Sequence, residues 1–154
     1  MRQVMEADKL ELISRNIFDS TDKMRTTQKA QLIGVKLADD NSISCEKITD
    51  YGDIYQMLQL STHHADKLGE YDLVAVLTAG WAAPNKDDES DNVAPSEHPE
   101  RRRVKLALIG YTANQTSSII AFDGDPEYIY ASGEGNGSGA LQETFEEFLN
   151  GIGW

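Results

Sequence analysis

The residues best suited to chemistry lie in one polar stretch between two apolar, strand-like segments. This stretch brings together an indole, an imidazole and three guanidinium groups, and its candidate contact residues are Trp81, Pro84, His98, Arg101 and Arg103. Guanidinium groups bind carboxylates and phosphates through paired hydrogen bonds, and tryptophan is a frequent anchor of protein interfaces. The stretch is therefore a candidate contact site for a protein partner or for an anionic ligand.

The arginines also have a plainer interpretation. The run 101–103 follows a series of carboxylates in the same segment, at Asp87, Asp88, Glu89 and Asp91. Exposed ion pairs of this kind are common and individually weak. We favour pairing within the segment for the arginines, whereas Trp81 is equally suited to an interface and to covering the edge of a sheet.

Metal and nucleophile chemistry has little support in the sequence. His63 and His64 are adjacent, so on a helix their side chains point about 100° apart, and no zinc-binding spacing occurs. Ser96 stands where the metalloprotease signature H-x-H-P has its first histidine, and Cys45 has the setting of a small buried hydrophobic residue. The sequence predicts no metal, cofactor or catalytic residue, and an enzyme is the less favoured interpretation.

A glycine-rich segment near the end of the chain loosely matches a phosphate-binding motif. Gly135, Gly137 and Ala140 fit G-x-G-x-x-A before a helical pattern. No further strand and no acidic ribose ligand follow, as the dinucleotide fingerprint requires. We favour a flexible connection into a helix.

Composition limits the partners. The 154 residues carry a net charge of −12, which disfavours nucleic acid phosphates and anionic membranes as partners. A single cysteine excludes an internal disulfide, and no apolar segment has the length of a membrane span or the position of a signal peptide. These features predict a cytoplasmic protein whose partner is another protein or a second copy.

The first half of the chain shows a helix, a hairpin and a second helix. Apolar spacing, including Val4, predicts a helix over 3–18, and alternation predicts strands over 31–37 and 42–48 around a turn at 39–41. The second helix begins at Asp50 or Gly52, with Asp50 as its cap, and ends at Leu68. Gly69 is expected to stop it in a left-handed conformation.

The second half predicts the rest of an antiparallel sheet. Strands are expected over 71–79, 103–112, 117–122 and 127–131, joined by turns too short for crossovers, apart from a long polar insertion over 80–102. The last helix has an apolar stripe formed by Leu141, Phe145, Phe148, Leu149 and Ile152. The chain is thus expected to form one α+β domain over 1–154, with a mostly antiparallel sheet of five to six strands and three helices.

This element order, α-β-β-α-β-β-β-(β)-α, is similar to that of roadblock-type and profilin-like domains. The resemblance concerns topology and includes no shared residue motif. It implies a scaffold for dimerisation and protein binding, although a fold alone does not determine function.

Two classes of function follow. The first is a small, self-associating protein-interaction domain with 80–103 as a contact surface, or, as a variant, an acidic mimic of nucleic acid that inhibits a basic partner. The alternative is a small ligand-binding protein or enzyme in which 80–103 forms a lid over a pocket for an anionic ligand.

Overall fold

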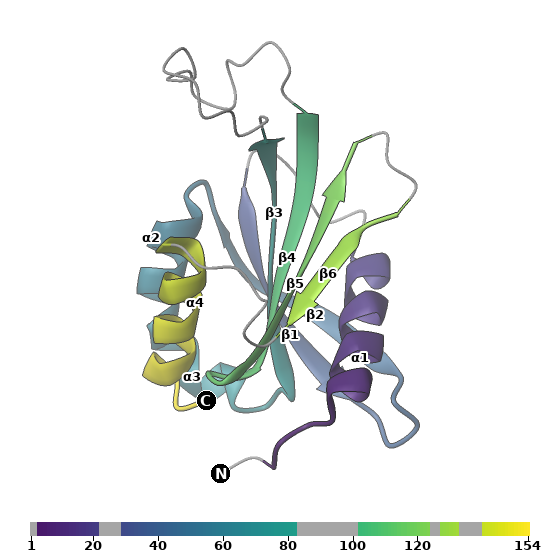
Figure 1. Ribbon diagram of the computed structural model, residues 1–154. Coiled ribbons are helices and arrows are strands. Elements are labelled where there is room, and N and C mark those ends of the chain that lie inside the picture. Colours follow the sequence, from purple (N-terminus) through teal and green to yellow (C-terminus); the bar gives the residue numbers. More distant parts are fainter. Residues whose placement is uncertain (1–2, 22–28, 83–101, 124–126, 133–139) are drawn as a thin grey trace.

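A six-stranded sheet with helices on both faces forms the fold (Figure 1). The computed structural model describes residues 3–21, 29–82, 102–123, 127–132 and 140–154. Within strands and helices, the side chains of residues 81, 82, 102 and 140 are not described. The strands are β1 (Ala30–Leu37), β2 (Ile43–Tyr51), β3 (Leu73–Ala82), β4 (Arg102–Thr112), β5 (Gln115–Phe122) and β6 (Ile129–Ser132).

Every strand runs antiparallel to its neighbours, in the order β2-β1-β3-β4-β5-β6. The helices are α1 (Ala7–Ser20), a middle helix in three consecutive pieces, and α4 (Ala140–Gly151). The middle pieces are α2 (Ile54–Leu60), the 3-10 turn η2 (Ser61–His64) and α3 (Ala65–Leu68). This order of elements confirms the expected α+β fold.

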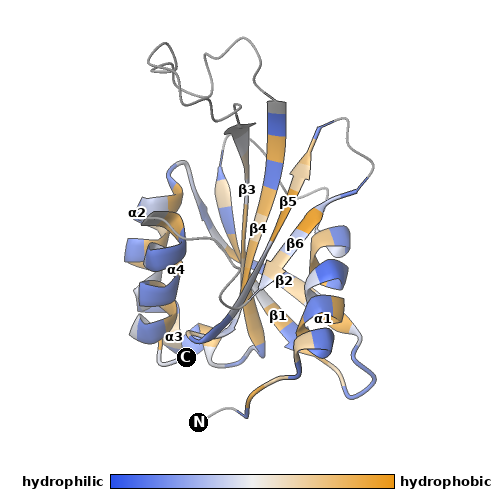
Figure 2. Cartoon of the chain, in the orientation of Figure 1, coloured by the Kyte–Doolittle hydropathy of each residue, from blue (hydrophilic) through white to orange (hydrophobic). Residues whose placement is uncertain are grey.

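The sheet buries both of its faces. Along β3, Leu73, Ala75 and Leu77 pack on the α1 side, whereas Val74 and Val76 pack on the side of α2, α3 and α4. A strand buried on both faces needs apolar residues at consecutive positions, which explains the unbroken apolar run that begins β3. Figure 2 shows hydrophilic outer surfaces on the helices of both layers.

The apolar stripes of the helices match their spacing in the sequence. Phe145, Phe148, Leu149 and Ile152 of α4 are buried, and Leu141 packs partly against the same core. In α1, Leu10, Ile13 and Ile17 are buried, as expected, but the helix begins only at Ala7. Val4 lies in the preceding extended segment and is 84% exposed, so its expected place in the helix is wrong.

The middle helix begins and ends differently from the prediction. Asp53 is its N-cap, because its Oδ1 accepts hydrogen bonds from the backbone N–H groups of Tyr55 at 2.8 Å and Gln56 at 3.1 Å. Asp50 belongs to β2 and pairs with Gln31 in the ladder. Gly69 has a φ of −61°, so the left-handed stop is also wrong. The left-handed turn residue is Asn41, at φ 67°, within the turn expected between β1 and β2.

Candidate functional site

The expected contact residues divide between strand ends and the segment that connects them. Strand β3 extends to Ala82 and β4 begins at Arg102, so the insertion narrows to residues 83–101. Trp81 and Arg103 are register partners across these two strands. Arg103 is exposed, and its backbone carbonyl accepts a hydrogen bond from the N–H of Asp123 at 2.8 Å.

Three of the expected residues cannot be placed. Pro84, His98 and Arg101 lie outside the described residues, as do Gly135 and Gly137 of the glycine-rich motif. The structure therefore brings together Trp81 and Arg103, at the level of the backbone, at the end of the sheet from which the insertion leaves.

Helix α4 covers only one end of the strands on its side of the sheet. A Cβ added to Gly110 of β4 would lie 2.7 Å from a methyl group of Leu149 in α4. Gly80 of β3 pairs with Val104, six residues from Gly110 along β4 and thus about 20 Å away. A Cβ at Gly80 would meet nothing within 4 Å. Within the described part of the chain, nothing therefore covers the strand ends next to the insertion on this face.

The two edges of the described sheet differ in their chemistry. Edge strand β2 carries charged residues at Glu46, Lys47 and Asp50, and its ladder with β1 has a register shift between Leu32 and Ile33. Charges and bulges are the devices by which proteins protect an edge from further pairing. Edge strand β6 has the sequence Ile-Tyr-Ala-Ser and contains no charged residue.

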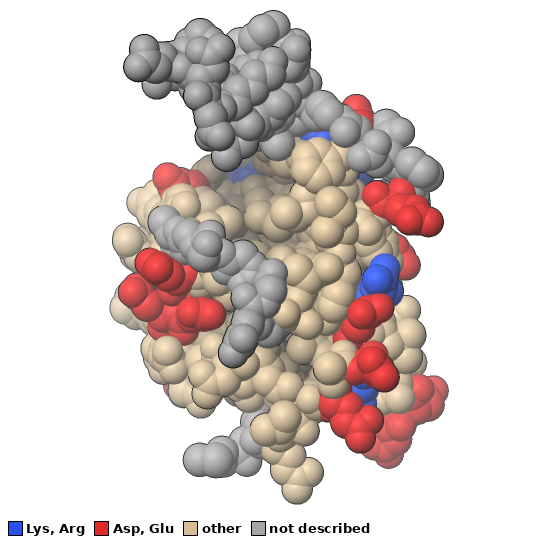
Figure 3. Space-filling view, viewed as in Figure 1, with Lys and Arg blue, Asp and Glu red and all other residues tan. Residues whose placement is uncertain are grey.

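Strand β6 exposes an apolar side chain beside a second strand that also has no charged residue. Ile129 is 59% exposed, and neighbouring β5 also lacks charged residues. In Figure 3, viewed with β5 and β6 in front, the described side chains between the acidic groups on the α4 side and those on the α1 side are mostly uncharged. The signal for this surface was present in the sequence, as two charge-free strands in a chain that is 26% charged.

Contacts with α1 hold β6 and the segment before it in place. Phe18 and Tyr128 make an edge-to-face aromatic contact with centroids 4.9 Å apart. The guanidinium carbon of Arg15 lies 5.2 Å from the ring centroid of Tyr128 and 5.5 Å from that of Tyr130. A hydrogen bond with Tyr128 and, less strongly, interactions with Glu11 raise the pKa of Arg15. One face of β6 is thus anchored, whereas no described strand pairs with its outer side.

A polar contact at the start of β3 is structural in character. The Tyr71 hydroxyl donates a hydrogen bond to the carboxylate of Glu46 in β2, and the Lys36 ammonium lies 5.4 Å from the Tyr71 ring centroid. The hydrogen bond to Glu46, followed by burial, raises the pKa of Tyr71 to about 12. The same bond, followed by the charges of Lys67 and Lys36, lowers the pKa of Glu46. This group of residues joins β2 to the entry of β3.

The remaining metal and thiol candidates are not gathered into a site. His63 and His64 lie in η2, and no group of three or more His, Cys, Asp or Glu residues in the described part of the chain could hold a metal ion. Cys45 lies half-buried in β2 beside the α1 core, where burial raises the pKa of its thiol. None of the described helices has the length and apolar character needed to cross a membrane.

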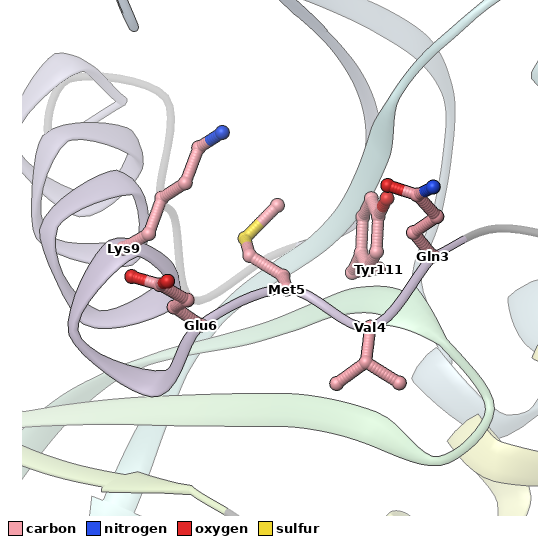
Figure 4. A pocket seen from close by; sticks show the side chains of 6 residues that line it. All are labelled: Gln3, Val4, Met5, Glu6, Lys9 and Tyr111. Atoms are coloured by element: carbon pink, nitrogen blue, oxygen red, sulfur yellow. The ribbon is translucent and has the colours of Figure 1, made fainter.

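A pocket of about 380 Å³ lies where the amino-terminal segment meets β4 (Figure 4). Its lining consists of Gln3, Val4, Met5, Glu6, Lys9 and Tyr111. The backbone N–H and carbonyl of Met5 both hydrogen-bond to the side-chain amide of Gln115, each at 2.8 Å, and this pair of bonds fixes the segment. Tyr111 lies eight residues along β4 from Arg103. The pocket is therefore at the opposite end of β4 from the insertion and gives no support to a lid.

Comparisons with protein-family models, with curated proteins and with solved structures found no match to this chain.

Proposed function

We propose that the chain is a small acidic protein-interaction domain that associates with itself, and that the 80–103 segment forms part of its contact surface. The observation that carries this proposal is the open end of the sheet beyond α4. There no described atom lies within 4 Å of a Cβ placed on Gly80, and Arg103 is exposed.

The surface around this end supports the same interpretation. The apolar side chains of Leu106, Ile120 and Phe122 are only partly buried, and Ile129 is largely exposed. Ladder pairing connects them, because Leu106 pairs with Ile120 and Ile120 pairs with Ile129. A contiguous apolar surface of this kind typically marks an interaction site.

Sedimentation velocity of the full chain over a wide concentration range tests self-association directly. We expect the weight-average sedimentation coefficient to rise with concentration. A chain that stays monomeric at millimolar concentration contradicts the self-association.

Replacing residues 85–94 with a short Gly-Ser turn tests the role of the insertion. We expect this variant to associate more weakly while its unfolding curve stays unchanged. Association equal to that of the unaltered chain would remove the insertion from the contact surface.

A further inference from the structure

We infer that strand β6 pairs with strand β6 of a second copy of this chain, in a symmetric antiparallel arrangement. This inference rests on the self-association proposed above and gives it a site. The two sheets would then join edge to edge through residues Ile129–Ser132 of each copy.

The backbone of β6 supplies the hydrogen-bonding groups for such a contact. Along an edge strand, alternate N–H and C=O groups point away from the sheet and can pair with another strand. Within the described residues β6 pairs only with β5, over Ser117–Ser132 to Ile120–Ile129. Among the devices that a strand carries in its own residues, β6 has its short length, since charges, proline and bulges are absent from Ile129–Ser132.

The difference between the two edges identifies the partner as a second β6. Pairing β6 with β2 of another copy would leave free edges and build an open filament. The bulge in β2 and its charges at Glu46, Lys47 and Asp50 oppose that contact. Pairing β6 with β6 uses the unprotected edge of both copies and leaves only protected edges, so assembly closes at a dimer.

The charge distribution favours the same contact. Each copy carries a net charge of −12, so two copies repel each other wherever their carboxylates meet. Strands β5 and β6 contain no charged residue, and Figure 3 places the acidic side chains on either side of this area. In two copies that meet at β6, the paired strands themselves bring no carboxylates together, and the exposed Glu127 lies two residues outside the strand. A four-residue strand gives a small interface, so we expect a low-affinity dimer.

A charge placed on this edge tests the inference. In Ile129→Lys, two ammonium groups would enter the seam of the dimer, and we expect the dissociation constant measured by sedimentation to rise about tenfold or more, which corresponds to about 1.4 kcal/mol. Leu60→Lys is the matched control, because it makes the same charge change at an exposed apolar residue on α2. This control should dimerise like the unaltered chain.

A second measurement does not depend on any substitution. Amide hydrogen exchange of the unaltered chain should slow across residues 129–132 as the protein concentration rises, whereas exchange in β2 should stay constant. Equal dimerisation by Ile129→Lys and the unaltered chain, or unchanged exchange in β6 on dimerisation, would overturn the β6 contact and leave self-association intact. If the unaltered chain remained monomeric in sedimentation, that result would instead contradict the proposed self-association itself.

Discussion

At the scale of single residues, close packing around Tyr71 explains a glycine inside a buried strand. A Cβ at Gly34 would lie 2.8 Å from three ring carbons of Tyr71, which is closer than real Cβ contacts come. Tyr71 cannot move away easily, because it is itself buried and hydrogen-bonded to Glu46. Gly34 is thus required by the space around it.

Gly34→Ala should destabilise the protein by about 1–3 kcal/mol, the usual cost of adding an atom to a packed core. Urea unfolding monitored by circular dichroism measures this change. Gly80→Ala is the control, since its added methyl group meets nothing within 4 Å and alanine loses less conformational entropy in a strand than glycine. We expect this control to be neutral or slightly stabilising. If Gly34→Ala proved as stable as Gly80→Ala, the close approach of the Tyr71 ring would be refuted.

The contact between Tyr71 and Glu46 also makes stability depend on pH. The pKa of Tyr71 is about 12 in the folded chain and 10.0 ordinarily, so the neutral phenol is favoured by folding. Its contribution is fully present below pH 10 and is lost as the pH rises from 10 to 12. The pKa of Glu46 is lowered from 4.5, so its contribution is present above that pH and is lost as the pH falls through the lowered pKa.

Tyr71→Phe should therefore be less stable than the unaltered chain at neutral pH, and the difference should shrink as the pH rises above 10. Urea unfolding of both proteins across this range measures the difference, and ionisation of the other tyrosines affects both proteins alike. A stability difference that does not change with pH would be incompatible with a hydrogen bond between Tyr71 and Glu46.

At the scale of elements, the spacing of apolar residues predicted the features that depend on neighbouring residues, such as the buried face of a helix. The spacing of Phe145, Phe148 and Leu149 identifies α4 and its buried face, because one stripe of a helix faces the core. The cap of the middle helix was assigned to Asp50 instead of Asp53, since both precede the apolar pattern. Pairing with β1 extends β2 through Asp50, and a single sequence does not show that long-range contact.

The candidate site also combines features that the local sequence predicts with features that depend on contacts between distant segments. That a strand lies within 127–131 could be inferred from residue types, although β6 begins two residues later, at Ile129, and ends at Ser132. Its position at an edge depends on the order β2-β1-β3-β4-β5-β6, which hydrogen bonds between distant segments establish. The sequence placed Trp81 in the insertion, whereas β3 extends to Ala82 and pairs Trp81 with Arg103 in the ladder.

At the scale of the whole molecule, net charge and local chemistry act in opposite directions on self-association. Two copies with a charge of −12 repel each other over distances set by ionic strength. The proposed contact at β6 is free of charges and gains nothing from electrostatic attraction. An interface formed by arginines, such as those of the run 101–103, and carboxylates would instead weaken as salt is added, because salt screens the attraction between opposite charges.

Dimerisation should therefore strengthen as salt is added. Raising the ionic strength from about 0.01 M to about 0.1 M shortens the Debye length from about 30 Å to about 10 Å, so repulsion between the copies falls while the hydrogen bonds and apolar contacts of β6 are retained. Sedimentation velocity in NaCl solutions across this range should show a dissociation constant that falls several-fold. Leu60→Lys should follow the same trend, because its substitution lies on α2, away from the β6 edge. Association that weakens as salt is added would contradict the β6 contact as the main source of affinity and assign that affinity to charged side chains of 80–103, the other part of the proposed contact surface, with its arginines as the first residues to substitute.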